Sequence, residues 1–262
     1  MIEVFRHASS KPGPKVLILG AIHGNEKCGA LALKKFIRQL DAGEIKLQKG
    51  SLTLVPVCNP KAFQLNKRYV EENLNRVMQP SQNPKSYESQ LANHICPLIE
   101  SSDYLLDLHS MQAKGLAFSM LNKDTPESIN FCRALNAPAM VKGWVEVFSK
   151  FPNVPSFCTQ TYADKFNIPN ALIECGSHED ASSVNVAHNA ILSALSYLEI
   201  LDNATLKAQG LDLGETPSKT IELKEIVFRK SLDDIFVKEW KNFDAVKKGE
   251  CIASRSNGEE VL

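Results

Sequence analysis

The chain has 262 residues, 44% of them hydrophobic, and its thirty Lys and Arg residues balance thirty Asp and Glu residues. This balance argues against nucleic acid or an anionic membrane surface as a partner, and no apolar run approaches the roughly 20 residues that cross a bilayer. The length suits one large α/β domain with an appendage, or two small domains.

Cysteine usage and the N-terminus bear on the compartment. The seven cysteines are scattered singly with no C-x-x-C pair, and the first ten residues lack the apolar stretch of a secretory signal. We therefore expect a protein of the reducing cytoplasm. The sequence does not determine an oligomeric state.

Strands alternate with helices up to residue 201. The apolar run 16–19 predicts a buried strand, and residues 29–40 repeat Leu, Phe and Ile at helical spacing. A polar run at 60–84 predicts a functional loop. The remaining predicted elements, in chain order, are a strand at 52–57 that is interrupted by Pro56 and therefore ends there or lies at a sheet edge, a helix at 86–100, a strand at 104–108, a helix at 127–135, a strand at 171–173 and a helix at 180–201.

The composition changes after about Gly210. Residues 220–227 and 231–240 are rich in β-branched and aromatic side chains, which indicates a small β-rich appendage. The fold class is therefore α/β, with a mostly parallel or mixed sheet flanked by helices. We predict a domain of the α/β class at 1–208, to which the motifs described below assign a zinc hydrolase site, and a small β-rich domain at 209–262.

The first motif that carries chemistry follows the first predicted strand. There Gly20-Ala-Ile-His-Gly-Asn-Glu26 places His23 and Glu26 three residues apart, just beyond the sheet edge where α/β folds bind ligands. His109 follows the third predicted strand at an equivalent position. Catalytic zinc takes three nitrogen or oxygen ligands from the protein and keeps a position for water. The pattern predicts a zinc site, with Asp107 on the strand face of His109 and placed to orient a ligand.

Taken singly, these residues leave other interpretations open. His23 fits a hydrogen-bonded loop histidine as well as a ligand, and Glu174 at a strand end fits an ion pair with a lysine. Arg68 and Arg76 fit solvated surface charges. The second histidine at an equivalent strand end favours the metal site.

Five blocks resemble, in order, the motifs of the succinylglutamate desuccinylase and aspartoacylase family within the zinc carboxypeptidase superfamily. They are Gly20-Ala-Ile-His-Gly-Asn-Glu26, Asn59-Pro60, Arg68-Tyr-Val-Glu-Glu-Asn-Leu-Asn-Arg76, Asp107-Leu-His109 and Ile173-Glu-Cys-Gly176. The resemblance implies a zinc carboxypeptidase-like fold. The C-terminal part is similar to the smaller domain of that family only in its β-rich character.

The resemblance also implies roles for these residues. His23, Glu26 and His109 would ligate one zinc ion per chain. Glu174 would be the general base that takes a proton from the zinc-bound water and returns it to the leaving nitrogen, and Arg68 would stabilise the oxyanion.

Asn75 and Arg76 match the pair that binds a substrate carboxylate, which a guanidinium meets with two parallel hydrogen bonds. The resemblance therefore implies a zinc-dependent amidohydrolase that cleaves a non-peptide amide bond in an N-acyl amino acid or a similar small carboxylated amide. Two alternatives stay open. One is a metallocarboxypeptidase acting on short peptides or cell-wall fragments, and the other is a non-catalytic zinc-binding sensor or interaction protein.

The chain departs from the family pattern at two sites. The block that usually reads Asp-Leu-Asn-Arg has Asn73 at its first position, which we interpret as a change in substrate preference. The arginine that reads a second carboxylate in aspartoacylase-like members has no counterpart in residues 162–165, which argues against N-acetylaspartate, although Lys165 or Arg133 are candidate substitutes. The short β-rich part indicates a reduced substrate cap.

Overall fold

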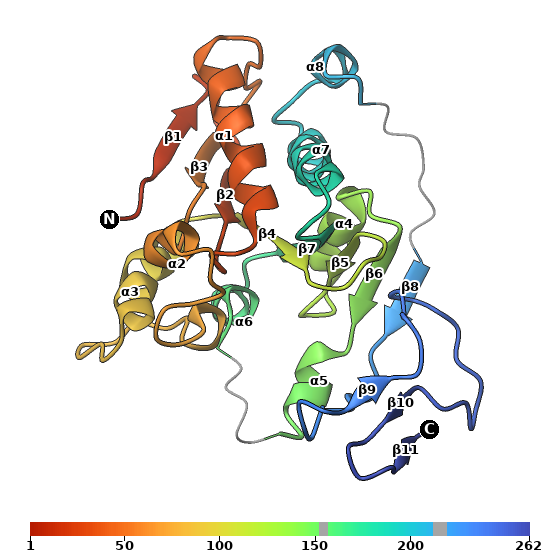
Figure 1. The fold of residues 1–262 in the computed structure, drawn as a ribbon. Helices are drawn as coiled ribbons and strands as arrows, with labels where there is room; N and C mark the ends of the chain where they lie inside the picture. The colour runs from red at the N-terminus through yellow and green to blue at the C-terminus, as the bar shows by residue number, and fades with distance from the viewer. Residues whose placement is uncertain (152–156, 212–218) are drawn as a thin grey trace.

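A computed structural model describes residues 1–151, 157–211 and 219–262 of the chain. Its centre is an eight-stranded mixed sheet with the order β1-β3-β2-β4-β7-β5-β6-β8 (Figure 1). The strands are β1 (Phe5–Ala8), β2 (Lys15–Gly20), β3 (Ser51–Val55), β4 (Tyr104–Met111), β5 (Phe118–Met120), β6 (Ala139–Lys142), β7 (Asn170–Ser177) and β8 (Lys219–Glu222). Strands β3, β2, β4 and β7 are parallel, while β1 and β5 pair antiparallel with β3 and β7.

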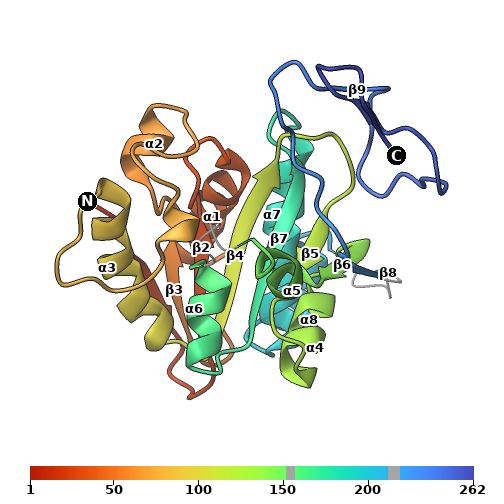
Figure 2. The same ribbon diagram turned by 90° about the horizontal axis from the view of Figure 1, so that it is seen from below.

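Helices cover both faces of this sheet, as Figure 2 shows from a second side. Buried residues of α1, α4 and α7 form one hydrophobic core with one face, and those of α3 and α6 form a second core with the other. The helices are α1 (Lys27–Asp41), α2 (Pro60–Gln64), the 3₁₀ helix η1 (Leu74–Arg76), α3 (Tyr87–Glu100), α4 (Pro126–Ala134), α5 (Trp144–Phe148), α6 (Thr159–Lys165), α7 (Ser182–Tyr197) and α8 (Asn203–Ala208). None of the helices in these described ranges is long and apolar enough to cross a membrane.

The predicted strands and helices of the α/β part all occur, and the deviations have local causes. Strand β3 ends at Val55 because Pro56 cannot donate to the ladder, and it lies between β1 and β2, so the alternative of an edge strand is wrong. The predicted loop at 60–84 holds α2 and η1, because Asn59 caps α2 and Pro60 suits a first helical turn. Strands β1, β5 and β6 were not predicted.

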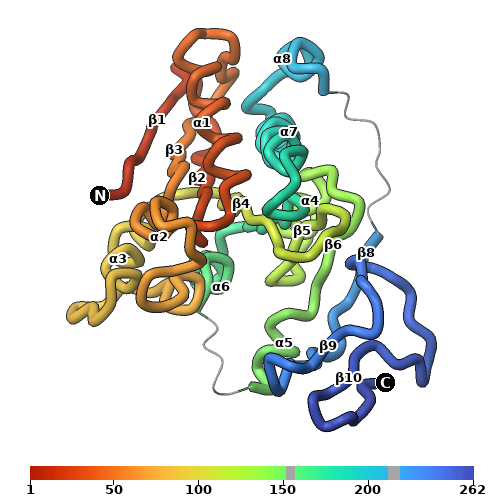
Figure 3. The backbone as a smooth tube through the Cα atoms, in the orientation of Figure 1, coloured from red at the N-terminus to blue at the C-terminus, as the bar shows by residue number. Residues whose placement is uncertain are grey.

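The C-terminal part is divided between two sheets. Strand β8, within the predicted strand region 220–227, pairs parallel with β6 and so extends the central sheet. A separate three-stranded antiparallel sheet follows, formed by β9 (Ile235–Phe236), β10 (Ala253–Ser254) and β11 (Glu260–Val261) (Figure 3). The domain boundary at 208/209 stays a prediction, and residues 212–218 just beyond it lie outside the described residues.

A buried carboxylate holds the loop between α2 and α3. Glu88, in the first turn of α3, is fully buried and accepts hydrogen bonds from the backbone N–H groups of Val70 (2.7 Å), Glu71 (3.2 Å) and Glu72 (3.2 Å). The side-chain amide of Asn59 donates a fourth, at 3.1 Å. Successive N–H groups that converge on one anion form a nest, which satisfies the charge without a cation.

Side chains of this loop also accept hydrogen bonds from the start of α3. The Glu71 side chain accepts a hydrogen bond from the backbone N–H of Tyr87 at 2.7 Å, and Glu72 accepts one from the hydroxyl of Ser86. Loop and helix start therefore cap each other. This clamp sets the path of residues 68–76, which contain Arg68, Asn75 and Arg76.

We predict that Glu88→Gln loosens residues 68–76 and destabilises the protein by about 2 kcal/mol, because the amide nitrogen cannot accept the backbone hydrogen bonds that a carboxylate oxygen accepts. Hydrogen exchange should accelerate at the amides of residues 70–72, while the central strands stay protected. Glu127→Gln, at an exposed glutamate in the first turn of α4, is the matched control and should change neither. Unchanged exchange in Glu88→Gln would contradict the clamp.

Candidate metal centre

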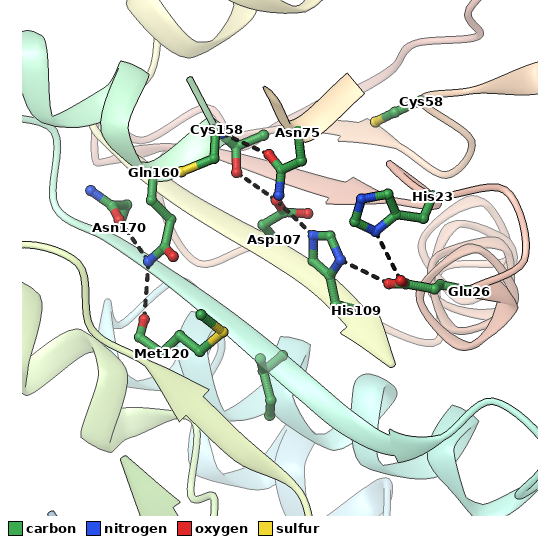
Figure 4. A network of polar contacts seen from close by, with 12 residues as sticks. His23, Glu26, Cys58, Asn75, Asp107, His109, Met120, Cys158, Gln160 and Asn170 are labelled. Atoms are coloured by element: carbon green, nitrogen blue, oxygen red, sulfur yellow. Dashed lines mark hydrogen bonds and ion pairs between the residues drawn. The ribbon is translucent and has the colours of Figure 1, made fainter. Parts of the chain in front are cut away.

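Three side chains from two strand ends meet on the sheet face that α3 and α6 cover. His23 and Glu26 lie between β2 and α1, and His109 lies near the end of β4. Their ligand atoms are all within 4.8 Å of one another, and each residue is at most 3% exposed. Figure 4 shows both imidazoles turned toward the carboxylate. Because β2 and β4 are parallel neighbours, their carboxyl ends bring the two histidines to one place.

Position 24 requires a glycine because helix α2 approaches its backbone closely, and not because the chain turns there. A Cβ at this position would overlap the backbone of Ala62 and Phe63 in α2, and the φ angle of Gly24 is not in the left-handed region. The absence of a side chain at Gly24 lets α2 pack on the loop between His23 and Glu26.

The carboxylate of Glu26 is at the centre of the charged groups. One oxygen lies 2.8 Å from Nδ1 of His23 and 2.8 Å from a guanidinium nitrogen of Arg68, and the other lies 2.8 Å from Nδ1 of His109. Burial raises the pKa of Glu26, but His109 and His23 outweigh it and hold this pKa well below its ordinary value. Burial lowers the pKa of His109, yet Asp107 and Glu26 raise it well above its ordinary value. Without a cation, this raised pKa favours the positively charged form of His109, in which both ring nitrogens are protonated.

The outer nitrogen of each imidazole faces an oxygen. Nε2 of His23 lies 3.0 Å from Oδ1 of Asn73, and Nε2 of His109 lies 3.0 Å from Oδ2 of Asp107. Asp107 in turn accepts a 2.6 Å hydrogen bond from the hydroxyl of Thr159. An oxygen behind the outer nitrogen fixes the ring and leaves the inner nitrogen for a metal. The expected contact between Asp107 and His109 is therefore present. The oxygen behind His109 belongs to a carboxylate, whereas the oxygen behind His23 belongs to the side-chain amide of Asn73.

The arrangement fits a divalent cation. Nδ1 of His23 is buried 2.8 Å from Glu26 but is not aligned for a hydrogen bond, so it has no partner within the described parts of the chain. Two imidazole nitrogens and a carboxylate oxygen, all buried and close together, form the donor set that zinc prefers. Binding of a cation would release the proton of His109 and relieve the unpartnered nitrogen.

Glu174 lies on β7 directly beside His109 on β4, since the two residues are register partners in the parallel pair. Its Oε2 is buried and has no hydrogen-bond partner among the residues that the structure describes. Burial is the main reason why the pKa of Glu174 is raised to about 7, an effect that Glu26 adds to and His109 opposes. A carboxyl group with a pKa near neutrality can both accept and release a proton at neutral pH.

The remaining predicted site residues lie around this centre. Arg68 is 45% exposed and bound to Glu26, so its guanidinium sits at the mouth of the site. Asn75 is buried and accepts a 2.9 Å hydrogen bond from the backbone N–H of Thr159. Arg76 follows it in η1, with its guanidinium 5.7 Å from the ring centre of Phe148.

Two supporting residues escaped the prediction from sequence. Thr159 bonds both Asp107 and Asn75, but a threonine in the first turn of a short helix is ordinary and signals no site. Glu88 positions the loop with the arginines, but an acidic residue in a first helical turn is usually an exposed partner of the helix dipole. Only the tertiary structure shows these contacts.

Known proteins share both the sequence and the fold. Residues 12–186 match the sequence model of the succinylglutamate desuccinylase/aspartoacylase catalytic domain. A probable aspartoacylase of Nostoc sp. is 36% identical over 133 residues, which are 47% of this chain and 44% of that protein. The N-acyl-aromatic-L-amino acid amidohydrolase of Rattus norvegicus is 29% identical over 141 residues, 48% of this chain and 43% of that protein. In both cases the match spans less than half of the relative's length.

A solved structure extends the likeness to nearly the whole chain. The product-bound ectoine utilization protein EutE (DoeB) from Ruegeria pomeroyi superposes with a TM-score of 0.75 at 20% identity, over 98% of this chain and 86% of that one. At this identity the likeness concerns the fold. Since the catalytic-domain match covers most of the chain, the protein belongs to the succinylglutamate desuccinylase/aspartoacylase family.

Proposed function

We propose that this protein is a zinc-dependent amidohydrolase that cleaves the amide bond of an N-acyl amino acid or a similar small carboxylated amide. The single observation that supports it most is the buried cluster of His23, Glu26 and His109, with Glu174 beside it. The names of the relatives point to the same substrate class, since a probable aspartoacylase and an N-acyl-aromatic-L-amino acid amidohydrolase are both named for acylated amino acids. A cytoplasmic location remains part of this proposal.

Each residue has a task that its position supports. Bound zinc would act as a Lewis acid and lower the pKa of a water molecule toward neutrality. Glu174, beside His109, accepts the proton of the attacking water and delivers it to the departing nitrogen. Arg68, at the mouth, donates to the oxygen that gains charge. Asn75 and Arg76 hold the substrate carboxylate and so place the amide next to Glu174.

The proposal is tested by zinc loading and a substrate panel. The zinc-loaded protein should hydrolyse N-acetyl amino acids, lose this activity on chelation and regain it with zinc. His109→Ala should bind zinc at least about tenfold more weakly in a chelator competition, because one of three ligands is removed. Faster hydrolysis of dipeptides than of every N-acyl amino acid would favour a carboxypeptidase, and no hydrolysis at all would favour a zinc-binding protein without catalysis.

Glu174→Gln separates the proposed base from a structural glutamate. The folded-state pKa of Glu174 is raised to about 7 from 4.5, so its stabilising effect is complete below pH 4.5 and is lost as pH rises through 7. In zinc-free protein, the Glu174→Gln variant, which is neutral at every pH, should equal the parent near pH 4 and be more stable by on the order of 3 kcal/mol at pH 8.5.

The same variant should retain zinc but lose at least about a hundredfold in kcat, as expected for removal of a general base. Glu179→Gln, at an exposed glutamate nearby, is the control and should match the parent in thermal unfolding and turnover. Parental kcat in Glu174→Gln would show that Glu174 is not the base.

Asn73 should set the affinity for zinc through His23. A carboxylate behind Nε2 makes an imidazole more basic, and partners of this kind change metal affinity by about 10–100-fold. Asn73→Asp should therefore tighten zinc binding by about tenfold and Asn73→Ala should weaken it, both measured by chelator competition. Equal zinc affinities in the three proteins would show that Asn73 does not act on the metal through His23.

A further inference from the structure

A small recess lies beside the proposed carboxylate site. It has a volume of about 90 Å³ and is lined by Asn75 and Arg76 together with Met120, Trp144, Phe148 and Leu172. Arg76 is therefore part of both the proposed carboxylate site and the recess. A carboxylate bound to Arg76 lies next to the recess. The rest of the same ligand must then lie over or inside it.

The sheet register ties the recess to the metal centre. Leu172 precedes Glu174 by two residues on β7, so both side chains point to the same face, one pleat apart. The cross-strand partners of Leu172 are Asp107 on one side and Met120 on the other, while His109 is the partner of Glu174. Asp107, Leu172 and Met120 therefore form one row of side chains across the sheet. This row is adjacent to the row that contains His109 and Glu174.

The floor of the recess is apolar, and two of the amide side chains that line it are already engaged. Met120, Phe148 and Leu172 supply carbon and sulfur surface. The Gln160 side-chain amide donates to the backbone oxygen of Met120 (3.0 Å) and to Oδ1 of Asn170 (3.1 Å), and Asn122 is bonded to Asp164. Asn75 and Arg76 remain as donors for a substrate carboxylate, and the buried indole N–H of Trp144 has no hydrogen-bond partner in the described part of the chain.

Positive charge is scarce around the recess. Among its described lining residues Arg76 is the only cation. Neither candidate substitute is among these lining residues: Arg133 is exposed on α4, which packs on the opposite face, and Lys165 is exposed, with its amine 5.4 Å from the ring centres of Phe157 and Tyr162. A second carboxylate placed here would find no further cation among these lining residues once Arg76 holds the first, which is unfavourable.

We infer that this recess is the side-chain subsite and that it selects a short, uncharged, apolar amino-acid side chain, so that the substrate is an N-acylated aliphatic amino acid. This inference rests on the proposed function. The size of the recess supports an aliphatic group, since a cavity that holds benzene measures roughly 150 Å³. The substrate has one carboxylate for Arg76, whereas an acylated aspartate or glutamate has two.

The test compares kcat/KM of the zinc-loaded protein for N-acetyl-L-valine, N-acetyl-L-aspartate and N-acetyl-L-tryptophan. N-Acetyl-L-valine should exceed each of the others by at least about tenfold, the usual scale of discrimination by an apolar pocket. A preference for N-acetyl-L-aspartate or N-acetyl-L-tryptophan overturns the inference and leaves the amidohydrolase standing. Failure to hydrolyse any N-acyl amino acid overturns the proposed function and this inference with it.

A charge placed at the rim gives a second, independent test. Val145 lines the recess and is 41% exposed, so Val145→Lys should fold and should raise the aspartate-to-valine ratio of kcat/KM at least about fivefold. Ser149→Lys adds the same charge to an exposed position just after α5 that does not line the recess, and should keep the parental ratio. A parental ratio in Val145→Lys, or an equal rise in both variants, contradicts the subsite.

Discussion

The structure depends on one buried carboxylate that two imidazoles and one guanidinium surround. Glu26 is 2% exposed and lies 2.8 Å from two imidazoles and one guanidinium. Placing such an anion in the interior is costly unless opposite charge surrounds it, and truncating one partner of a buried pair leaves the other uncompensated. The strands that deliver His23 and His109 and the loop that delivers Arg68 are therefore all coupled to this one side chain.

The fold supplies this geometry through two ordinary rules. Parallel neighbours end at the same sheet edge, which brings His23 and His109 together, and side chains two residues apart share a face, which aligns Leu172 with Glu174. The buried Glu88 then fixes the loop that crosses over this face. The site therefore lies between the strand ends that carry its side chains and the loop that Glu88 holds in place.

Sequence patterns predicted the parts of this site that depend on local order. The strand before His23 and the strand before His109 could be located because each is a short apolar run followed by a polar ligand. Contacts between distant segments could not be predicted in this way. Strand β8 has an ordinary β-rich pattern, and only pairing with β6 shows that it extends the central sheet. Likewise the recess joins η1, β5, α5 and β7, whose proximity no local pattern encodes.

Family membership and site geometry both support the proposed metal-dependent hydrolase, and the recess beside Arg76 supports the inferred substrate class. The most direct test of the central claim is X-ray absorption at the zinc edge of the loaded protein. Two imidazole nitrogens and one carboxylate oxygen at about 2.0–2.2 Å, with the imidazole signal reduced in His23→Ala, are the predicted result. Sulfur ligands near about 2.3 Å, or a spectrum unchanged by His23→Ala, would contradict the proposed site.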